Sequence, residues 1–233
     1  MTFRCAELAR DLSEPLAGTA PFAPRWELVE REKPWGRDHG LVVEGAKVLL
    51  VLRVGDAEPR DERRYLVCTN GARDPCCAIR GASVAQALDR LRPGQVYECS
   101  HLGGHRFAAN LLVLPDGLCF GLLDARSAPE VVEALVADRL PLDRLRGRTA
   151  YRPEHQAAEI LARRALGLTG LDDIRLVEAC GSEPQAHFEL ADGRRVGVTV
   201  EAKRLQPRRV SCRDDKVEEP TEWTLGELVA LSH

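Results

Sequence analysis

Two cysteines and two histidines of this chain have the residue types and spacings of metal ligands. Eight residues separate Cys68 from Cys77, and three separate His101 from His105. Because two glycines are costly inside a helix, the pair Gly103–Gly104 predicts a tight loop in which both imidazoles can face one metal. Cys77 is expected just before a helix, whose unpaired amide groups would favour a thiolate.

Two thiolates and two imidazoles suit either a tetrahedral zinc ion or an iron–sulfur cluster. Structural zinc sites commonly use cysteines two to four residues apart, so the wider gap between these cysteines weakly disfavours zinc. Two well-separated ligand pairs fit a [2Fe–2S] cluster, in which each pair holds one iron. The spacing alone leaves both alternatives open.

These four residues must be positioned by the elements around them, and the pattern of apolar residues predicts a compact set. We expect strands at Tyr65–Cys68, Gln95–Cys99, Asn110–Leu114 and Leu118–Leu123, and helices at Ser83–Leu91 and from Ser127 onward. Their order is strand, helix, strand, ligand loop, two strands joined by a hairpin turn, and helix. This is the order of a thioredoxin-like domain with a mixed sheet.

The whole chain is expected to be α/β (α+β overall), with the thioredoxin-like core between two further regions. Residues 1–62 are predicted to form an N-terminal arm and strands that pack on the core, residues 63–140 the core, and residues 150–233 a small C-terminal α+β lobe. Residues 139–152 are predicted to be a linker. Outside the core, strands are expected near Trp26–Glu30, Lys47–Val54, Ile174–Ala179, Gln185–Leu190, Arg194–Glu201 and Arg209–Cys212, and helices at Glu154–Leu166 and Thr224–Leu231.

The composition excludes several classes of protein. The chain has 233 residues, a formal net charge of −3 and eight cysteines. No apolar run approaches the ~20 residues that a membrane helix needs, and the N-terminal residues lack the apolar stretch of a signal peptide. We therefore expect a cytoplasmic protein without membrane contact, whose thiols stay reduced. Scattered arginines and 5% aromatic residues argue against a nucleic-acid partner.

Several motifs resemble those of the sucrase/ferredoxin-like family. They are Glu14–Ala20, Pro34–Gly36, Cys68–Gly71, Arg73–Asp74, Cys76–Ala78, Arg80–Gly81, Cys99–Asn110 and Pro115–Gly117. The likeness covers the N-terminal arm and the core, is most specific around the cysteines and histidines, and is weaker through the C-terminal lobe.

The resemblance implies a ferredoxin core and a cofactor. The family is similar to thioredoxin-like [2Fe–2S] ferredoxins, in which four cysteines hold the cluster, and members with a His-x-Gly-Gly-His loop are understood to use two cysteines and two histidines. The implied ligands are Cys68, Cys77, His101 and His105. The motif Cys-Ala-x-Arg-Gly places the second ligand on Cys77 rather than on its neighbour Cys76. Cys99 is expected to pack within its strand.

We expect a one-electron carrier rather than an enzyme. Two neutral imidazoles in place of two thiolates make the ligand set less negative, which raises the reduction potential above that of plant-type ferredoxins. Imidazoles can also take up protons on reduction, so the potential is expected to depend on pH. The alternatives are a zinc-stabilised Cys2His2 binding module without redox activity and a thiol oxidoreductase that uses Cys68 or Cys76. No Cys-x-x-Cys pair supports the latter.

The expected partner is a redox protein, either a reductase or an electron acceptor. Arg73, Arg80 and Arg106 are candidates for hydrogen bonds to the cluster or for a face that docks an acidic partner, with ordinary ion pairs as the alternative. The sequence carries no signal for a particular oligomeric state. The word sucrase in the family name finds no support in the sequence, because no carboxylate pair for glycoside hydrolysis can be placed.

Overall fold

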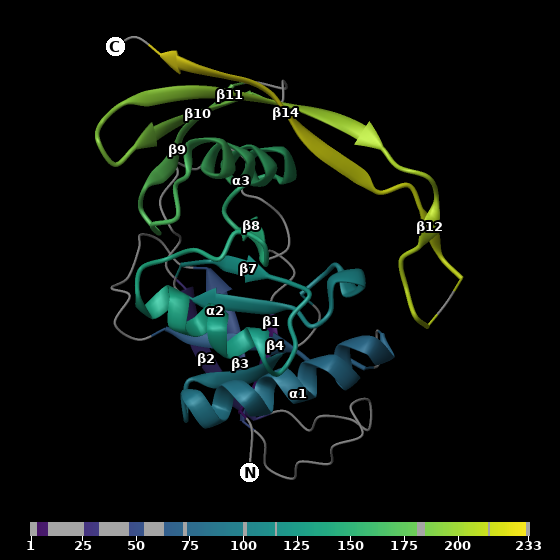
Figure 1. Ribbon diagram of the computed structural model, residues 1–233. Helices are drawn as coiled ribbons and strands as arrows, with labels where there is room; N and C mark the ends of the chain where they lie inside the picture. Colours follow the sequence, from purple (N-terminus) through teal and green to yellow (C-terminus); the bar gives the residue numbers. More distant parts are fainter. Residues whose placement is uncertain are drawn as a thin grey trace.

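The computed structural model describes residues 4–8, 26–32, 47–53, 63–71, 74–99, 102–114, 116–180, 185–213 and 215–231. The predicted ligand His101 and the predicted docking residue Arg73 lie outside the described residues, as do the motifs Glu14–Ala20 and Pro34–Gly36. The described residues include an eight-stranded mixed sheet and a four-stranded antiparallel sheet (Figure 1).

The centre of the large sheet has the strand order and strand directions of a thioredoxin-like domain. Its elements are β4 (Arg64–Cys68), α1 (Pro75–Leu91), β5 (Val96–Cys99), β6 (Leu111–Leu114), β7 (Leu118–Phe120) and α2 (Ser127–Val136). β4 and β5 are parallel, β6 is antiparallel to β4, and β7 is antiparallel to β6, in the order β5-β4-β6-β7. A parallel pair joined by a helix and followed by an antiparallel hairpin is the predicted arrangement, so the prediction of a thioredoxin-like core with a mixed sheet is confirmed.

Four more strands extend this sheet at both edges. They are β1 (Arg4–Leu8), β2 (Trp26–Glu32), β3 (Lys47–Arg53) and β8 (Leu145–Arg148), and the full order is β2-β3-β1-β5-β4-β6-β7-β8. The strands predicted near Trp26 and Lys47 are confirmed, whereas the sequence predicts neither β1 nor β8. The prediction of a linker at residues 139–152 is wrong, because β8 lies within it and pairs with β7.

Side chains of the central strands alternate between two apolar clusters, as strand geometry requires. Tyr65 and Val67 of β4 join the cluster under α1 and α2. Leu66 and Cys68 point to the other side and belong to a second cluster. The other buried members of this second cluster are Cys77, Tyr97, Cys99, Ala108, Leu112 and Leu114. The predicted ligands Cys68 and Cys77 therefore lie in the same apolar environment.

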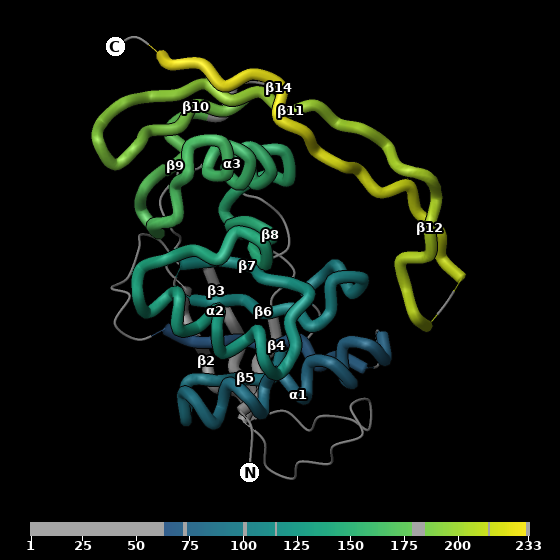
Figure 2. The backbone as a smooth tube through the Cα atoms, viewed as in Figure 1, coloured from purple at the N-terminus to yellow at the C-terminus, as the bar shows by residue number. Residues whose placement is uncertain are grey.

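The C-terminal region forms the four-stranded sheet with one helix packed against it (Figure 1). Its elements are α3 (Pro153–Leu166), β9 (Ile174–Cys180), β10 (Gln185–Leu190), β11 (Arg195–Arg204) and β14 (Thr221–Leu231), with the strand order β14-β11-β10-β9. The hairpin of β12 (Arg208–Arg209) and β13 (Val217–Glu218) is separate. Figure 2 shows that β11 and β14 extend as a two-stranded ribbon, which carries this hairpin away from the C-terminal sheet.

The helix predicted at Thr224–Leu231 is wrong, because this segment is part of β14. The three-residue spacing of Leu225 and Leu228 suggests a helix, but both leucines pack against the apolar cluster of the C-terminal sheet. The strand achieves this with a register shift opposite Val198 and Val200, where β14 has one extra residue. Such a β-bulge gives a strand the side-chain spacing of a helix over a few residues.

A buried network of charges joins β8 to α3. Glu159 Oε1 lies 2.9 Å from Arg163 Nε and 3.2 Å from Arg148 Nε. Both guanidinium groups also donate to the carbonyl oxygen of Leu171. Burial alone would lower the pKa of Arg148, but the charge and hydrogen bond of Glu159, together with the charges of Tyr151 and Asp116, outweigh burial and raise this pKa. One carboxylate thus pairs with two buried cations where β8 meets α3.

Candidate metal centre

The thiols of Cys68 and Cys77 lie together where β4 ends and α1 begins. Each residue is 1% exposed, and both belong to the apolar cluster that includes Leu66 and Leu112. The hydrogen bond between the Cys77 and Cys68 thiols, together with burial, raises the pKa of Cys77. Two adjacent buried thiols keep their protons unless a cation replaces them, and a bound metal would take both as thiolates.

The expectation that helix amides favour a thiolate at Cys77 is wrong. Cys77 lies within the first turn of α1 rather than before it, and its backbone N–H donates to the carbonyl oxygen of Asp74 at 3.0 Å. Because its thiol bonds to Cys68 within the apolar cluster, neighbouring thiols and burial determine its pKa instead.

A close contact between α1 and β4 brings the two cysteines together. Gly81 lies one helical turn after Cys77, so both residues are on one face of α1. A Cβ at position 81 would overlap the carbonyl oxygen of Cys68. Glycine is therefore needed for the helix to approach the end of the strand this closely, which gives a physical reason for the glycine of the Cys-Ala-x-Arg-Gly motif.

The loop that carries His105 has the predicted tight conformation. Gly103 and Gly104 have φ angles of 76° and 63°, and His105 begins the short 3-10 helix η4 (His105–Phe107). Arg146 Nη1 donates to the carbonyl oxygen of Gly103 at 3.3 Å and to Asn110 Oδ1 at 2.9 Å. Asn110 Nδ2 donates to the carbonyl oxygen of Gly104 at 3.2 Å. Side chains from outside the loop therefore hold it in place.

His105 contacts Asp74, the residue at the N-terminus of α1. His105 Nδ1 lies 3.2 Å from Asp74 Oδ2, and Asp74 is 1% exposed. The other carboxylate oxygen, Oδ1, accepts hydrogen bonds from the Cys212 N–H at 2.7 Å, the Cys212 thiol at 2.9 Å and the Ser211 hydroxyl at 3.1 Å. Burial alone would raise the pKa of Asp74, but the hydrogen bonds from Cys212 and Ser211, followed by the charge of His105, lower it.

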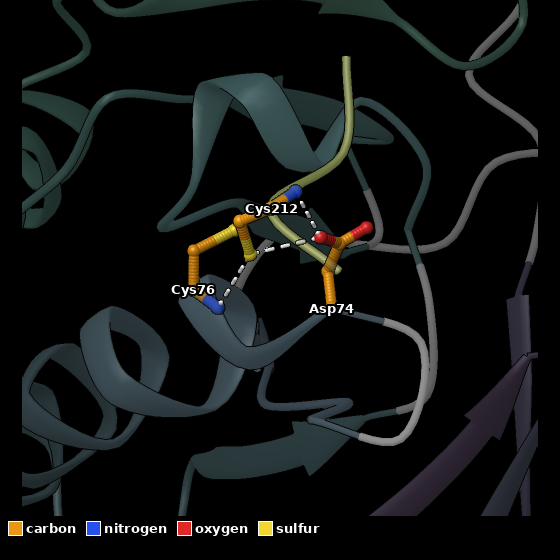
Figure 3. Close-up of side chains that lie close together, drawn as sticks. All are labelled: Asp74, Cys76 and Cys212. Atoms are coloured by element: carbon orange, nitrogen blue, oxygen red, sulfur yellow. Dashed lines mark hydrogen bonds between the residues drawn. The ribbon is translucent and has the colours of Figure 1, made fainter. Parts of the chain in front are cut away.

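Asp74, Cys76 and Cys212 form a second group of ligand-type side chains (Figure 3). Their ligand atoms all lie within 4.8 Å of one another. The Cys76 N–H donates to Cys212 Sγ at 3.2 Å, and the Cys76 thiol donates to the carbonyl oxygen of His105 at 3.6 Å. Burial, followed by the hydrogen bond to Asp74, raises the pKa of Cys212 to about 11. Cys76 is half-buried and remains the alternative to Cys77 as a ligand.

Of the predicted ligands, Cys68 and Cys77 lie together, and His105 contacts Asp74 at the N-terminus of α1. Among the described residues, the group of ligand atoms that lie within 4.8 Å of one another is that of Asp74, Cys76 and Cys212, and it includes none of these three. Cys99 lies opposite Cys68 in the register of β5 and β4 and is buried, as expected of a cysteine that packs within its strand. Three residues that shape the site are absent from the predicted ligand set: Asp74, Arg146 and Cys212. An aspartate directly before Pro75 is a recognisable helix-start signal, but nothing in the spacing of the sequence connects the other two to the site.

The fold and the site together define a thioredoxin-like protein with a candidate metal centre. Its sequence matches the profile of the sucrase/ferredoxin-like family over residues 4–147, and the chain belongs to this family. Comparison with curated proteins gave no significant match. Within the described part of the chain, no helix is long and apolar enough to cross a membrane.

Solved structures of a thioredoxin-like [2Fe–2S] ferredoxin from Aquifex aeolicus are also similar to this chain. One shares 18% identity, covers 39% of this chain and 94% of the ferredoxin, and has a TM-score of 0.34. One cysteine-to-serine variant of it shares 18% identity, covers 36% of this chain and 96% of the variant, and has a TM-score of 0.32. A second such variant shares 20% identity, covers 36% of this chain and 95% of the variant, and has a TM-score of 0.30. The thioredoxin-like assignment rests on the strand order and not on these scores.

Proposed function

We propose that this protein is a one-electron carrier that holds a [2Fe–2S] cluster. The proposed ligands are Cys68, Cys77, His101 and His105. The observation that carries the proposal is the buried pair of Cys68 and Cys77 thiols, whose apolar cluster also contains Leu102 and Ala108 from the two sides of His105. Membership of the sucrase/ferredoxin-like family supports it.

The residues present fit such a cluster in kind. Thiolate and imidazole are the soft and intermediate ligands that iron–sulfur centres use, and both thiols already lie side by side. When bound, the cluster supplies reversible one-electron transfer. Leu66, Tyr97 and Leu112 surround the thiols with apolar surface, which limits the access of water and so influences the reduction potential.

The two imidazoles distinguish this ligand set from one of four cysteines. Neutral imidazoles leave the set less negative, so the proposed potential is higher than that of a plant-type ferredoxin. His105 Nδ1 faces Asp74 and can hold a proton there, while Nε2 is the other nitrogen of the ring. We propose that this proton makes the potential depend on pH.

The proposed partner is a redox protein with an acidic surface. Arg106 and Arg146 both lie over the Phe107 ring, 4.7 Å and 5.0 Å from its centroid. Burial, followed by the charges of Arg208 and Arg146, lowers the pKa of Arg106. Arg106 and Arg208 are exposed, and exposed cations beside a redox site attract an acidic partner. Arg80 instead donates to the carbonyl oxygen of Ala108 at 3.2 Å. We also propose a cytoplasmic, reducing compartment.

One set of measurements tests the proposal. Freshly purified protein is expected to be coloured, with iron and acid-labile sulfide in equal amounts, and to give an electron paramagnetic resonance signal after one-electron reduction. Colourless protein that contains zinc and cannot be reconstituted with iron and sulfide would contradict the proposal and favour the zinc-stabilised binding module. Replacing His101 or His105 by cysteine is expected to retain the cluster, lower its potential and change the visible spectrum.

A further inference from the structure

We propose that Asp74 positions the imidazole of His105, and that Ser211 and Cys212 of the C-terminal arm hold Asp74 in place. The C-terminal arm is the hairpin of residues 205–220 that contains β12 and β13. This inference rests on the proposed function, because it concerns the environment of a proposed cluster ligand. It gives the C-terminal arm a role in the site.

The first step is the contact between His105 and Asp74. A histidine that binds a metal through one ring nitrogen almost always donates the N–H of the other to a carboxylate, a carbonyl group or water. His105 Nδ1 lies within ion-pair distance of Asp74 Oδ2, at 3.2 Å, although the two atoms are not aligned as a hydrogen bond. Once the ring turns so that Nδ1–H donates to Asp74, Nε2 is the nitrogen left to bind iron. Asp74 thus selects which nitrogen of His105 becomes the ligand and sets the orientation of the ring.

The second step is what holds Asp74. Its Oδ1 accepts three hydrogen bonds, two from Cys212 and one from Ser211. Three donors on one oxygen keep the carboxylate from rotating, so Oδ2 stays directed at His105. Because Asp74 is buried, these donors also replace the water that would otherwise solvate its charge.

The third step is what holds the arm against α1. The Cys76 N–H, at the start of α1, donates to Cys212 Sγ at 3.2 Å. Within the arm, the Val210 N–H donates to the carbonyl oxygen of Lys216 at 3.1 Å, whereas the pair of Arg209 and Asp215 at the tip is exposed and adds little. Hydrogen bonds within the arm therefore help to fix the loop that presents Cys212.

The arm lies outside residues 4–147, the segment that matches the family. Asp74 and Cys212 are 138 residues apart in the sequence. A part of the chain outside the segment that matches the family thus reaches the proposed cluster site. A carboxylate that accepts the Nδ1 proton makes the imidazole a stronger electron donor, so the arm would lower the reduction potential by keeping Asp74 on His105.

The test uses the full chain with its cluster reconstituted and compares Asp74→Asn, Cys212→Ala and Cys212→Ser with the unaltered protein. The matched control is Asp215→Asn, which removes a carboxylate from the exposed tip of the same arm. Iron and sulfide content reports whether the cluster is present. The reduction potential and the nitrogen hyperfine couplings from pulsed electron paramagnetic resonance report on the ligating imidazole.

We expect Asp74→Asn to keep the cluster, shift the potential upward and change the nitrogen couplings of one imidazole. Cys212→Ala should shift the potential and the same couplings, because Asp74 loses the thiol donor. Cys212→Ser should restore the unaltered values, because a serine hydroxyl can donate to Asp74. Asp215→Asn should leave all readouts unchanged.

Three results separate the possible failures. If the potential and couplings of Asp74→Asn match those of Asp215→Asn, the positioning role is wrong and the proposed function stands. If Cys212→Ala and Cys212→Ser both lose the cluster or a cysteine-to-iron absorption band, Cys212 is itself a ligand and the positioning role is wrong. If the unaltered protein takes up no iron–sulfur cluster, the proposed function fails. If Asp74→Asn does not fold, Cys212→Ala and Cys212→Ser still test the role of the arm. Equal potentials and nitrogen couplings in Cys212→Ala, Cys212→Ser and the unaltered protein would overturn it.

Discussion

Gly81 lies so close to Cys68 that a Cβ at position 81 would overlap the Cys68 carbonyl oxygen. This contact sets the distance between the end of β4 and the first turns of α1, and hence between the thiols of Cys68 and Cys77. Gly81→Ala is expected to push α1 away from β4. Overpacking of this kind costs about 1–3 kcal/mol, which would appear in urea unfolding, and iron content should fall in the same sample. Ser83→Ala, on the exposed face of α1, is the control and should retain both properties.

Arg146 holds the backbone of the His105 loop through Gly103. Arg146→Ala should leave the loop free to open, and cluster loss to an iron chelator is expected to become roughly 5–30-fold faster, as a change of 1–2 kcal/mol predicts. Arg144→Ala is the control, because the Arg144 guanidinium donates to the carbonyl oxygen of Leu122 instead. Equal rates of cluster loss in the two variants would show that the loop does not depend on Arg146.

The buried carboxylate of Glu159 pairs with both Arg148 and Arg163. Glu159→Gln removes the carboxylate that both buried cations contact, and loss of about 3–5 kcal/mol in the free energy of unfolding is expected. Glu130→Gln breaks an exposed i,i+4 pair with Arg126 and should cost less than about 0.5 kcal/mol. Both values can be measured by urea denaturation. Similar losses in the two variants would contradict the proposed importance of the buried network.

The hydroxyl of Tyr151 gives the C-terminal region a pH dependence at high pH. Burial raises the pKa of Tyr151 from 10.0 to about 12, so the folded protein holds this proton more tightly than the unfolded chain. The associated stability is complete below pH 10 and is lost as the pH rises toward 12, to a total of roughly 2–3 kcal/mol. Unfolding free energies at pH 8 and pH 11.5 should show a smaller decrease for Tyr151→Phe than for the unaltered protein. An equal decrease in both would assign the effect to other groups.

The exposed cations Arg106 and Arg208 should influence electron transfer to charged partners. Oxidation of the reduced protein by ferricyanide, an anion, is expected to slow as ionic strength increases. At low salt, Arg106→Gln should be oxidised by ferricyanide more slowly than the unaltered protein. The same variant should be oxidised faster by a cationic cobalt complex. The same direction of change with both oxidants would show that charge near the site does not guide the encounter.

Local patterns in the sequence predict the core well. Each helix, strand or turn of the core can be recognised from the apolar spacing or the turn residues of its own segment. Tyr65–Cys68, the helix that follows and the hairpin of β6 and β7 are all predicted in the correct order. The same reasoning fails at Leu225 and Leu228, where a β-bulge reproduces helical spacing. It fails again at β8, since a strand that contains Arg146 and Arg148 lacks the apolar alternation expected of a sheet.

In the candidate site, too, residues that belong to short sequence motifs could be named from the sequence, whereas residues that reach the site from distant segments could not. Cys68, Cys77 and His105 are predicted because each belongs to a short motif. Cys212 has no motif, and its contact with Asp74 spans 138 residues. Contacts at such separation depend on where the β11–β14 ribbon places the arm, and no spacing rule along the chain encodes that.

The late position of the arm in the sequence has a consequence for how the site is assembled. During synthesis, the proposed ligands between Cys68 and His105 leave the ribosome before Cys212 has been made. Until then, Asp74 at that end of α1 lacks the donors that Ser211 and Cys212 supply in the complete chain. Docking of Ser211 and Cys212 on Asp74 would then be a closing step, and the order of translation itself would separate synthesis of the proposed ligands from completion of the site.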